Sequence, residues 1–119
     1  MIVIRKALIS AAAACALLAS PAGAQSAAPK SATPQQNLDC VVWASYRAGI
    51  APIDEMRNAF ILATAWFIGL YEGQTGKLID EDMVARGIAM TEAQINAAES
   101  ACIARFRNFG DRLALVGQK

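Results

Sequence analysis

The residues with the most obvious chemistry are three cysteines, Cys15, Cys40 and Cys102. Cys15 lies in an N-terminal leader, which leaves Cys40 and Cys102 in the rest of the chain. These two are too far apart in sequence for a Cys-x-x-Cys redox centre and too few for a zinc site. Outside the cytoplasm such a pair forms a disulfide, so we predict a Cys40–Cys102 bridge worth about 4 kcal/mol. Two buried free thiols are the alternative if the helices that carry them do not meet.

The chain contains no histidine. This removes the usual general base, the Ser-His-Asp and Cys-His nucleophiles and the commonest metal ligand. A pair of carboxylates could still hydrolyse a glycoside, but they would have to face each other across a cleft. Every acid here has a surface or helix-cap explanation. We therefore predict a protein that is not an enzyme and has no catalytic residues, metal site or cofactor.

Two short motifs resemble ligand loops in composition alone. The segment 73–77, GQTGK, lacks the spacing of a P-loop and is followed by Leu78 and Ile79 instead of Lys-Ser or Lys-Thr. The acidic run 80–82 is not followed by oxygen ligands at the spacing of a calcium loop. We interpret the first motif as a connector and the second as the first turn of a helix capped by Asp80.

The leader has the parts of a cleavable signal peptide: a basic start, an apolar stretch over 7–19 and small residues over 22–24. We predict that residues 1–24 are removed by a cut after Ala24, which places the protein in the periplasm or the medium with no transmembrane anchor. An uncleaved anchor is the less favoured alternative, because the apolar stretch is shorter than the roughly 20 residues that span a bilayer. A lipoprotein lipidated at Cys15 is another.

The chain without its leader is close to neutral. Of the 11 Lys and Arg residues, Arg5 and Lys6 belong to the leader, which leaves nine against 10 Asp and Glu residues. Nucleic-acid binding draws on clustered Lys and Arg, so we expect no nucleic-acid partner. Below about pH 4 the acids lose their charge while the bases keep theirs. Acid would therefore make the chain strongly positive and loosen it.

Residues 25–36 contain two prolines, small polar residues and no large apolar side chain, so we predict a flexible linker there. The domain over 37–117 is predicted to be all-α, a small bundle of about four helices stapled by the disulfide. The first helix covers 38–48, stops at Gly49 and places Cys40 at the start of an aromatic stripe that continues with Trp43.

The last helix has the clearest boundary signal in the sequence. Thr91 and Gln94 fit a capping box, with Met90 and Ile95 as the hydrophobic staple around it. From there to Gly117 an apolar stripe recurs every three or four residues and includes Cys102. The opposite face is predicted to be solvated, with a site for an anionic partner as the alternative. The stripe contains Ile95, Ala98, Cys102, Phe106, Phe109, Leu113 and Val116, and the opposite face Arg105, Arg107, Asp111 and Arg112.

A long helix is predicted after Pro52, which suits a first turn. Its segment 59–71 carries no charge, so it must be covered on nearly every side, as a central core helix or at a subunit interface. Trp66 and Phe67 point about 100° apart and cannot face the same groove. One of them would meet solvent in a four-helix packing, so we predict a homodimer with this helix at its centre. The expected apolar interface consists of Phe60, Ile61, Leu62, Trp66, Phe67, Leu70 and Tyr71.

Together, Cys40, the segment 66–73 (WFIGLYEG), Cys102, Phe106 and Phe109 resemble the periplasmic acid-stress chaperones of the HdeA type. The resemblance implies a disulfide-linked helical protein that is dimeric near neutral pH, opens in acid and holds unfolding envelope proteins. A different class fits the residues as well: an envelope-associated interaction or structural protein with no acid-linked activity. Sedimentation between pH 7 and pH 2 separates the two, because only the chaperone needs to dissociate in acid.

Overall fold

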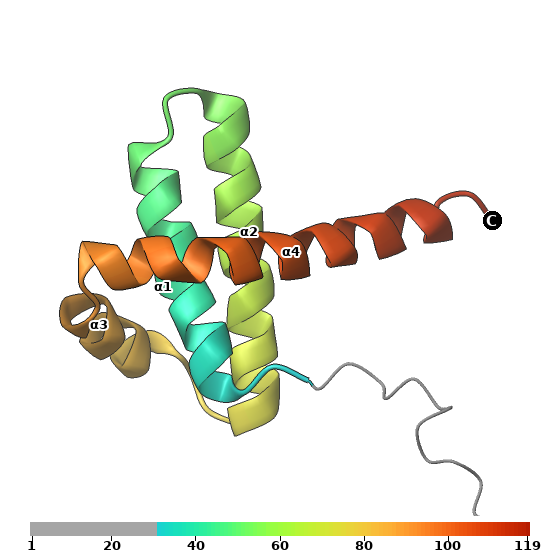
Figure 1. Ribbon diagram of the computed structural model, residues 1–119. Helices are drawn as coiled ribbons and strands as arrows, with labels where there is room; N and C mark the ends of the chain where they lie inside the picture. The colour runs from blue at the N-terminus through green and yellow to red at the C-terminus, as the bar shows by residue number, and fades with distance from the viewer. Residues whose placement is uncertain (1–30) are drawn as a thin grey trace, which may run out of the picture. The chain divides into compact units, whose positions relative to one another are not determined.

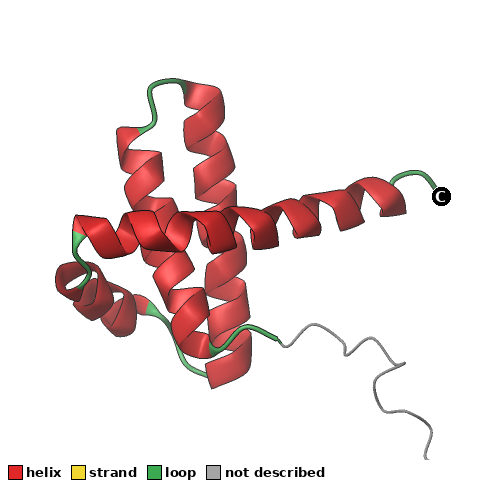
Figure 2. Cartoon of the chain, in the orientation of Figure 1, coloured by secondary structure: helices red, strands yellow, loops and turns green. Residues whose placement is uncertain are grey.

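The computed structural model describes residues 31–119. The predicted signal peptide and residues 25–30 of the predicted linker lie outside this part of the chain. Residues 31–119 form four helices and no strand, as Figure 1 and Figure 2 show. This confirms the predicted all-α fold. The helices are α1 (Pro34–Ile50), α2 (Asp54–Thr75), α3 (Asp80–Ala89) and α4 (Glu92–Val116).

The first helix begins at Pro34, before the predicted start at 38, and so takes in the end of the predicted linker 25–36. The Thr33 side chain accepts a hydrogen bond from the Gln36 backbone at 3.2 Å, and the Thr33 backbone donates to the Gln36 side chain at 2.9 Å. Pro34 suits the first helical position because an N–H there would lack a helical partner. A capping box thus orders residues whose composition alone indicates a linker.

The central helix is α1, which packs against α2, α3 and α4. Buried side chains lie on several sides of it, including the consecutive residues Val41 and Val42 and the nearby Ala44. In α2 only Ala63, Phe67 and Tyr71 are buried. The sequence left two roles open for the uncharged segment 59–71, a central core helix or a subunit interface. The central core helix is α1 and not α2, because α1 is buried on more of its circumference.

Helices α1 and α2 form an antiparallel hairpin, and α4 crosses both and extends past α2 (Figure 1). Pro52 lies in the α1–α2 connection, ahead of Asp54, and not in the first turn of α2 as predicted. At the other end α2 stops at Gly76, whose φ of 69° is the left-handed conformation that glycine adopts without strain.

Helix α3 begins at Asp80, which is its first residue and not its cap; the capping position belongs to Ile79. No residue within α3 is buried, whereas Ile79 and Met90 at its two ends are. The next helix, α4, starts with the predicted capping box of Thr91. Helix α3 is therefore attached to the core by its ends, by the half-buried Met83 and by polar contacts of its side chains.

The apolar stripe of α4 is buried only in its first half. Ile95 and Cys102 are 7% and 1% exposed, whereas Leu113 and Val116 are 53% and 69% exposed. From Gly110 to the end of the helix every residue is exposed. The sequence pattern predicted one continuous core-facing stripe, but the hairpin is too narrow to cover all of α4.

Candidate functional site

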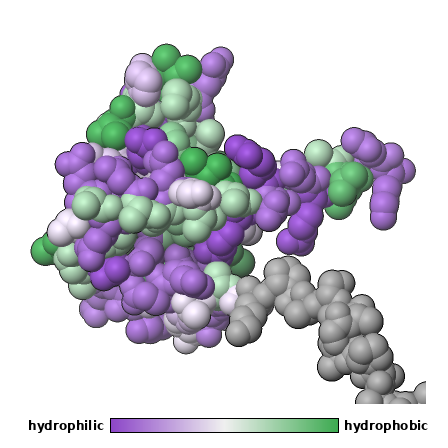
Figure 3. Space-filling view, viewed as in Figure 1, coloured by the Kyte–Doolittle hydropathy of each residue, from purple (hydrophilic) through white to green (hydrophobic). Residues whose placement is uncertain are grey.

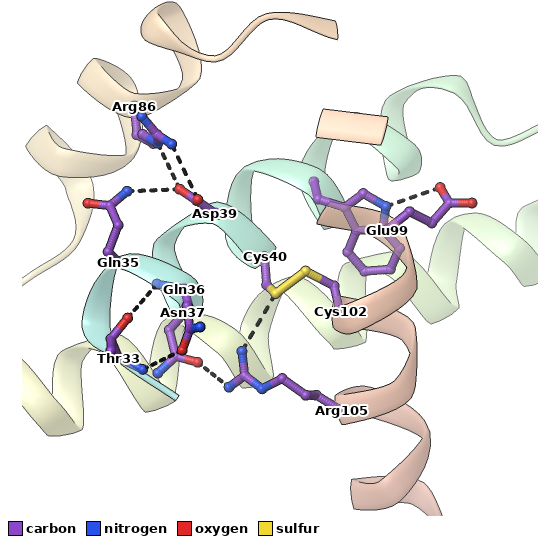
Figure 4. The surroundings of a disulfide bond; sticks show 11 residues. Thr33, Gln35, Gln36, Asn37, Asp39, Cys40, Arg86, Glu99, Cys102 and Arg105 are labelled. Atoms are coloured by element: carbon purple, nitrogen blue, oxygen red, sulfur yellow. Dashed lines mark hydrogen bonds and ion pairs between the residues drawn. A yellow bond between two sulfur atoms is a disulfide. The ribbon is translucent and has the colours of Figure 1, made fainter. Parts of the chain in front are cut away.

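The disulfide joins Cys40 of α1 to Cys102 of α4 where the two helices meet (Figure 4). The Sγ–Sγ distance is 2.04 Å and the Cα–Cα distance is 5.5 Å, as expected for a disulfide. The two cysteines are 3% and 1% exposed. The predicted pairing is confirmed, and α1 and α4 are neighbours as it required.

Arg105 lies beside this disulfide and is half-buried. Its guanidinium donates to Asn37 Oδ1 and, at 3.6 Å, to Cys40 Sγ, and it lies 5.0 Å from the centre of the Phe67 ring. Burial lowers the pKa of this guanidinium. The prediction of a solvated position is wrong, because Arg105 follows Cys102 by one helical turn and projects from the same side of α4.

A network of hydrogen-bonded polar side chains continues from Arg105 to the first residues of α1. Asn37 is 1% exposed, and its Nδ2 donates to Gln74 Oε1 at 2.6 Å. The Gln74 amide in turn donates to the carbonyl of Ala32 at 2.6 Å. These contacts tie the first turn of α1 to the last turn of α2 and to α4. The sequence offered no sign of this hydrogen-bond network except the Thr33 capping box, which places Asn37 inside a helix.

Two carboxylates join α1 to its other neighbours. Glu99 of α4 accepts from Trp43 Nε1 at 3.2 Å and pairs with Arg47 at 2.7 Å. Asp39 of α1 pairs with Arg86 of α3 at 2.7 Å. Sequence reasoning had not singled out either acid, because partners far apart in the chain leave no local spacing to read.

A third carboxylate, Asp82, joins α3 to α2. It accepts a hydrogen bond from the Tyr71 hydroxyl and pairs with Lys77 Nζ at 2.9 Å. The hydrogen bonds from Tyr71 and Lys77 lower the pKa of Asp82, and the same contacts raise the pKa values of both partners. The acidic run thus has two roles: Asp80 and Glu81 lie exposed in the first turn of α3, while Asp82 faces α2.

The acids of α3 do not form the carboxylate pair that glycoside hydrolysis would need. Asp80 and Glu81 both line an open depression with Val84 and Ile88, but they are neighbours on one helix and do not face each other across a cleft. Within residues 31–119 there is also no cluster of three or more side chains suited to hold a metal ion.

The seven residues of the predicted apolar interface lie in different environments. Phe67 and Tyr71 are 0% and 5% exposed in the core of the chain itself, so they form no surface. Ile61 and Leu62 are 52% and 57% exposed. The other three are half-buried against the core: Phe60, Trp66 and Leu70.

Trp66 packs against α4. Its ring lies 4.8 Å from that of Phe109 in a stacked arrangement and 6.0 Å from that of Phe106. The adjacent Phe67 points into the core. The prediction that one of this pair meets solvent holds only in part: Phe67 is buried, and Trp66 is half-buried because α4 covers the side of α2 that carries it.

The exposed apolar residues of the hairpin concentrate near the α1–α2 connection. Figure 3 shows hydrophobic residues at that end of the molecule and a further one on the projecting end of α4. We name the five large exposed residues of the hairpin the hairpin surface. They are Ile50, Ile53, Met56, Ile61 and Leu62, with exposed fractions between 43% and 57%.

A cavity of about 200 Å³ lies between the hairpin and α4. Its walls are almost wholly apolar, with one charged residue, Arg107, among them. The residues that line it are Trp43, Ala59, Phe60, Ala63, Ile103, Phe106 and Arg107. It would accept one apolar side chain of a bound segment.

Comparison of the chain with protein-family models, curated proteins and solved structures finds no match. Among residues 31–119, no helix is both long enough and apolar enough to cross a membrane.

Proposed function

We propose that this chain is an exported binding protein of chaperone type, without enzymatic activity, that holds apolar segments of unfolding envelope proteins. The observation that supports the proposal is the hairpin surface, where Ile50, Ile53, Met56, Ile61 and Leu62 are 43% to 57% exposed. Several large apolar side chains exposed at one end of a small domain favour contact with another protein. The cavity lined by Trp43 is separate from this surface and offers a place for one inserted side chain.

At neutral pH a second copy of the chain would cover this surface. A two-fold dimer is the simplest closed assembly, because it uses the same patch on both subunits. Ile61 and Leu62 are the members of the predicted interface that are free for such a contact. The dimer would keep the binding surface covered until the two subunits separate.

Acid would open the protein. Asp39 and Glu99 carry the ion pairs that join α1 to α3 and α1 to α4, and Asp82 contacts Tyr71 of α2 and Lys77 of the α2–α3 connection. Strong acid neutralises carboxylates in general, while Lys and Arg residues keep their charge and repel one another. Helix α3 would separate first because it buries no residue of its own. The disulfide would keep α1 and α4 together.

The test measures holdase activity and association on the same preparations. Reduced, unfolded α-lactalbumin is the client, and light scattering reports its aggregation at pH 7 and at pH 3. Wild-type protein should sediment as a dimer at pH 7, dissociate at pH 3 and suppress aggregation only at pH 3. Leu62→Ser should reduce suppression, whereas the matched change Leu78→Ser, at a residue 73% exposed near α3, should not. Equal suppression by both variants would contradict the proposed surface.

The alternative is an envelope-associated interaction or structural protein with no acid-linked activity. Burial of Phe67 and Tyr71 supports it, because these residues of α2 serve the fold of the chain itself. In that case the protein keeps one oligomeric state from pH 7 to pH 3 and does not suppress client aggregation at either pH.

Export is tested separately by the intact mass of protein recovered from the cell envelope. The mature chain should begin at Gln25 and weigh two hydrogens less than the reduced form, because Cys40 and Cys102 are bonded. A mass that includes Met1 would contradict cleavage.

A further inference from the structure

The C-terminal part of α4 has an apolar face with nothing to cover it within the described chain. Phe106 and Phe109 pack on Trp66, and the same spacing continues to Leu113 and Val116, which are 53% and 69% exposed. We name residues 110–116 the α4 arm; all seven are exposed. About two helical turns without tertiary contact are marginal on their own, since packing supplies most of the stability of a helix in a protein.

The hairpin has an uncovered groove on the side away from α4. On each helix of the hairpin a residue of this groove lies two positions after a tryptophan: Ser45 after Trp43, and Ile68 after Trp66. Two positions correspond to a rotation of about 200° around a helix. Trp43 and Trp66 contact α4, so the groove faces the opposite way. We name it the back groove. Its volume is about 380 Å³, and its lining is Ser45, Ala48, Ile61, Thr64, Ala65 and Ile68.

The arm cannot reach the back groove of its own chain. The Cys40–Cys102 disulfide and the stacking of Trp66 on Phe109 hold α4 on the front of the hairpin. The arm then runs past α2, away from α1, as Figure 1 shows. An occupant from this chain would therefore have to come from a second copy.

The lengths of the elements suit such an exchange. Helix α4 has 25 residues and is about 37 Å long, whereas two packed helices are about 20 Å across. If two hairpins stand side by side about a two-fold axis parallel to α2, each α4 covers the front of its own hairpin and reaches the back of the other. The two arms then occupy the two back grooves, and the assembly closes. Leu62, on the outer edge of α2, lies near the axis.

We propose that the α4 arm of one chain docks in the back groove of a second copy, so that Leu113 and Val116 pack on Ile61, Ala65 and Ile68 of that copy. This rests on the homodimer of the proposed function and assigns its contacts. The arm carries Asp111 and Arg112 beside its apolar residues, so its own charges balance and the contact rests on its apolar face.

The first experiment measures dimer dissociation by sedimentation at pH 7. Leu113→Asp with Val116→Asp should raise the dissociation constant at least about 100-fold, since both side chains become charged in a buried contact. The matched pair Val84→Asp with Ile88→Asp, at residues 64% and 83% exposed on α3, should leave it unchanged. Because all four residues are exposed, circular dichroism should remain that of the wild type. A dimer that persists in the arm variant overturns the docking but leaves the proposed dimer intact, whereas a monomeric wild type overturns both.

The second experiment distinguishes arm exchange from other dimers. Ala65→Arg should block the back groove and yield a monomer. A mixture of this variant with the arm variant should restore a heterodimer, because one intact arm meets one intact groove. Failure to restore it, when each variant alone is folded, overturns the docking. A photo-reactive residue at position 113 should cross-link to residues 61–68 of another chain; cross-links to a different protein or to the partner's position 113 would overturn it too.

Discussion

Removal of the disulfide should cost a large part of the stability of this domain. In the double variant Cys40→Ala with Cys102→Ala, the unfolded chain regains the freedom that a bridge between residues 62 apart in sequence removes. Loop closure of that length is worth about 4 kcal/mol. Domains of this size have total stabilities of about 5–15 kcal/mol. The variant should therefore be marginally folded, with α4 the helix that loses most of its attachment.

Urea unfolding followed by circular dichroism measures this loss. With a slope of about 2 kcal/mol per molar urea, the midpoint should fall by about 2 M. Wild-type protein reduced with a phosphine and held reduced should show a similar fall. A loss below about 1 kcal/mol in both samples would refute the reasoning, because it would mean that the unfolded chain is not constrained by the bridge.

Three further predictions concern single side chains. Thr91→Ala removes the cap of α4 and should lower the free energy of unfolding by about 1 kcal/mol in urea titration, with Thr91→Ser as a control near the wild type. Phe67→Ala empties the centre of the core and should cost about 3–5 kcal/mol by the same measurement. Asp82→Asn tests pH dependence. Because folding lowers the pKa of Asp82, its contribution is present above the unfolded pKa of 3.8 and is lost as the pH falls through the lower folded value. The wild type should therefore lose more stability between pH 6 and pH 2 than the Asp82→Asn variant, and equal losses would count against the Tyr71–Asp82 contact.

Local signals in the sequence predicted the features that depend on residues close together in the chain, such as the start of a helix and the apolar side that it buries. Thr91 and Gln94 located the start of α4, and the stripes through Cys40 and Cys102 indicated the bridge between α1 and α4. The same kind of signal exists at Thr33, but the prolines and alanines around it favoured a linker. A capping box is a stronger guide than composition when the two disagree over a few residues.

Tertiary packing determines which apolar and charged side chains are covered, and the local sequence pattern does not show this. No feature of the neighbouring sequence distinguishes Trp66, which α4 covers, from Leu62, which stays exposed. Arg105 looked like a surface residue by type, but its long side chain reaches Asn37 between helices. Which apolar residues remain for a partner depends on where α4 crosses the hairpin, and no spacing along α2 encodes that.

The position of the disulfide also bears on how the chain would oxidise if it is exported as proposed. With the leader removed, Cys40 and Cys102 permit only one intramolecular pairing, so no bond has to be reshuffled. With the leader retained, Cys15 would raise the number of possible pairings to three and add a competing thiol. Cleavage of the leader as proposed would therefore also remove the cysteine that could mispair, and the mature chain would need an oxidant but no disulfide isomerase.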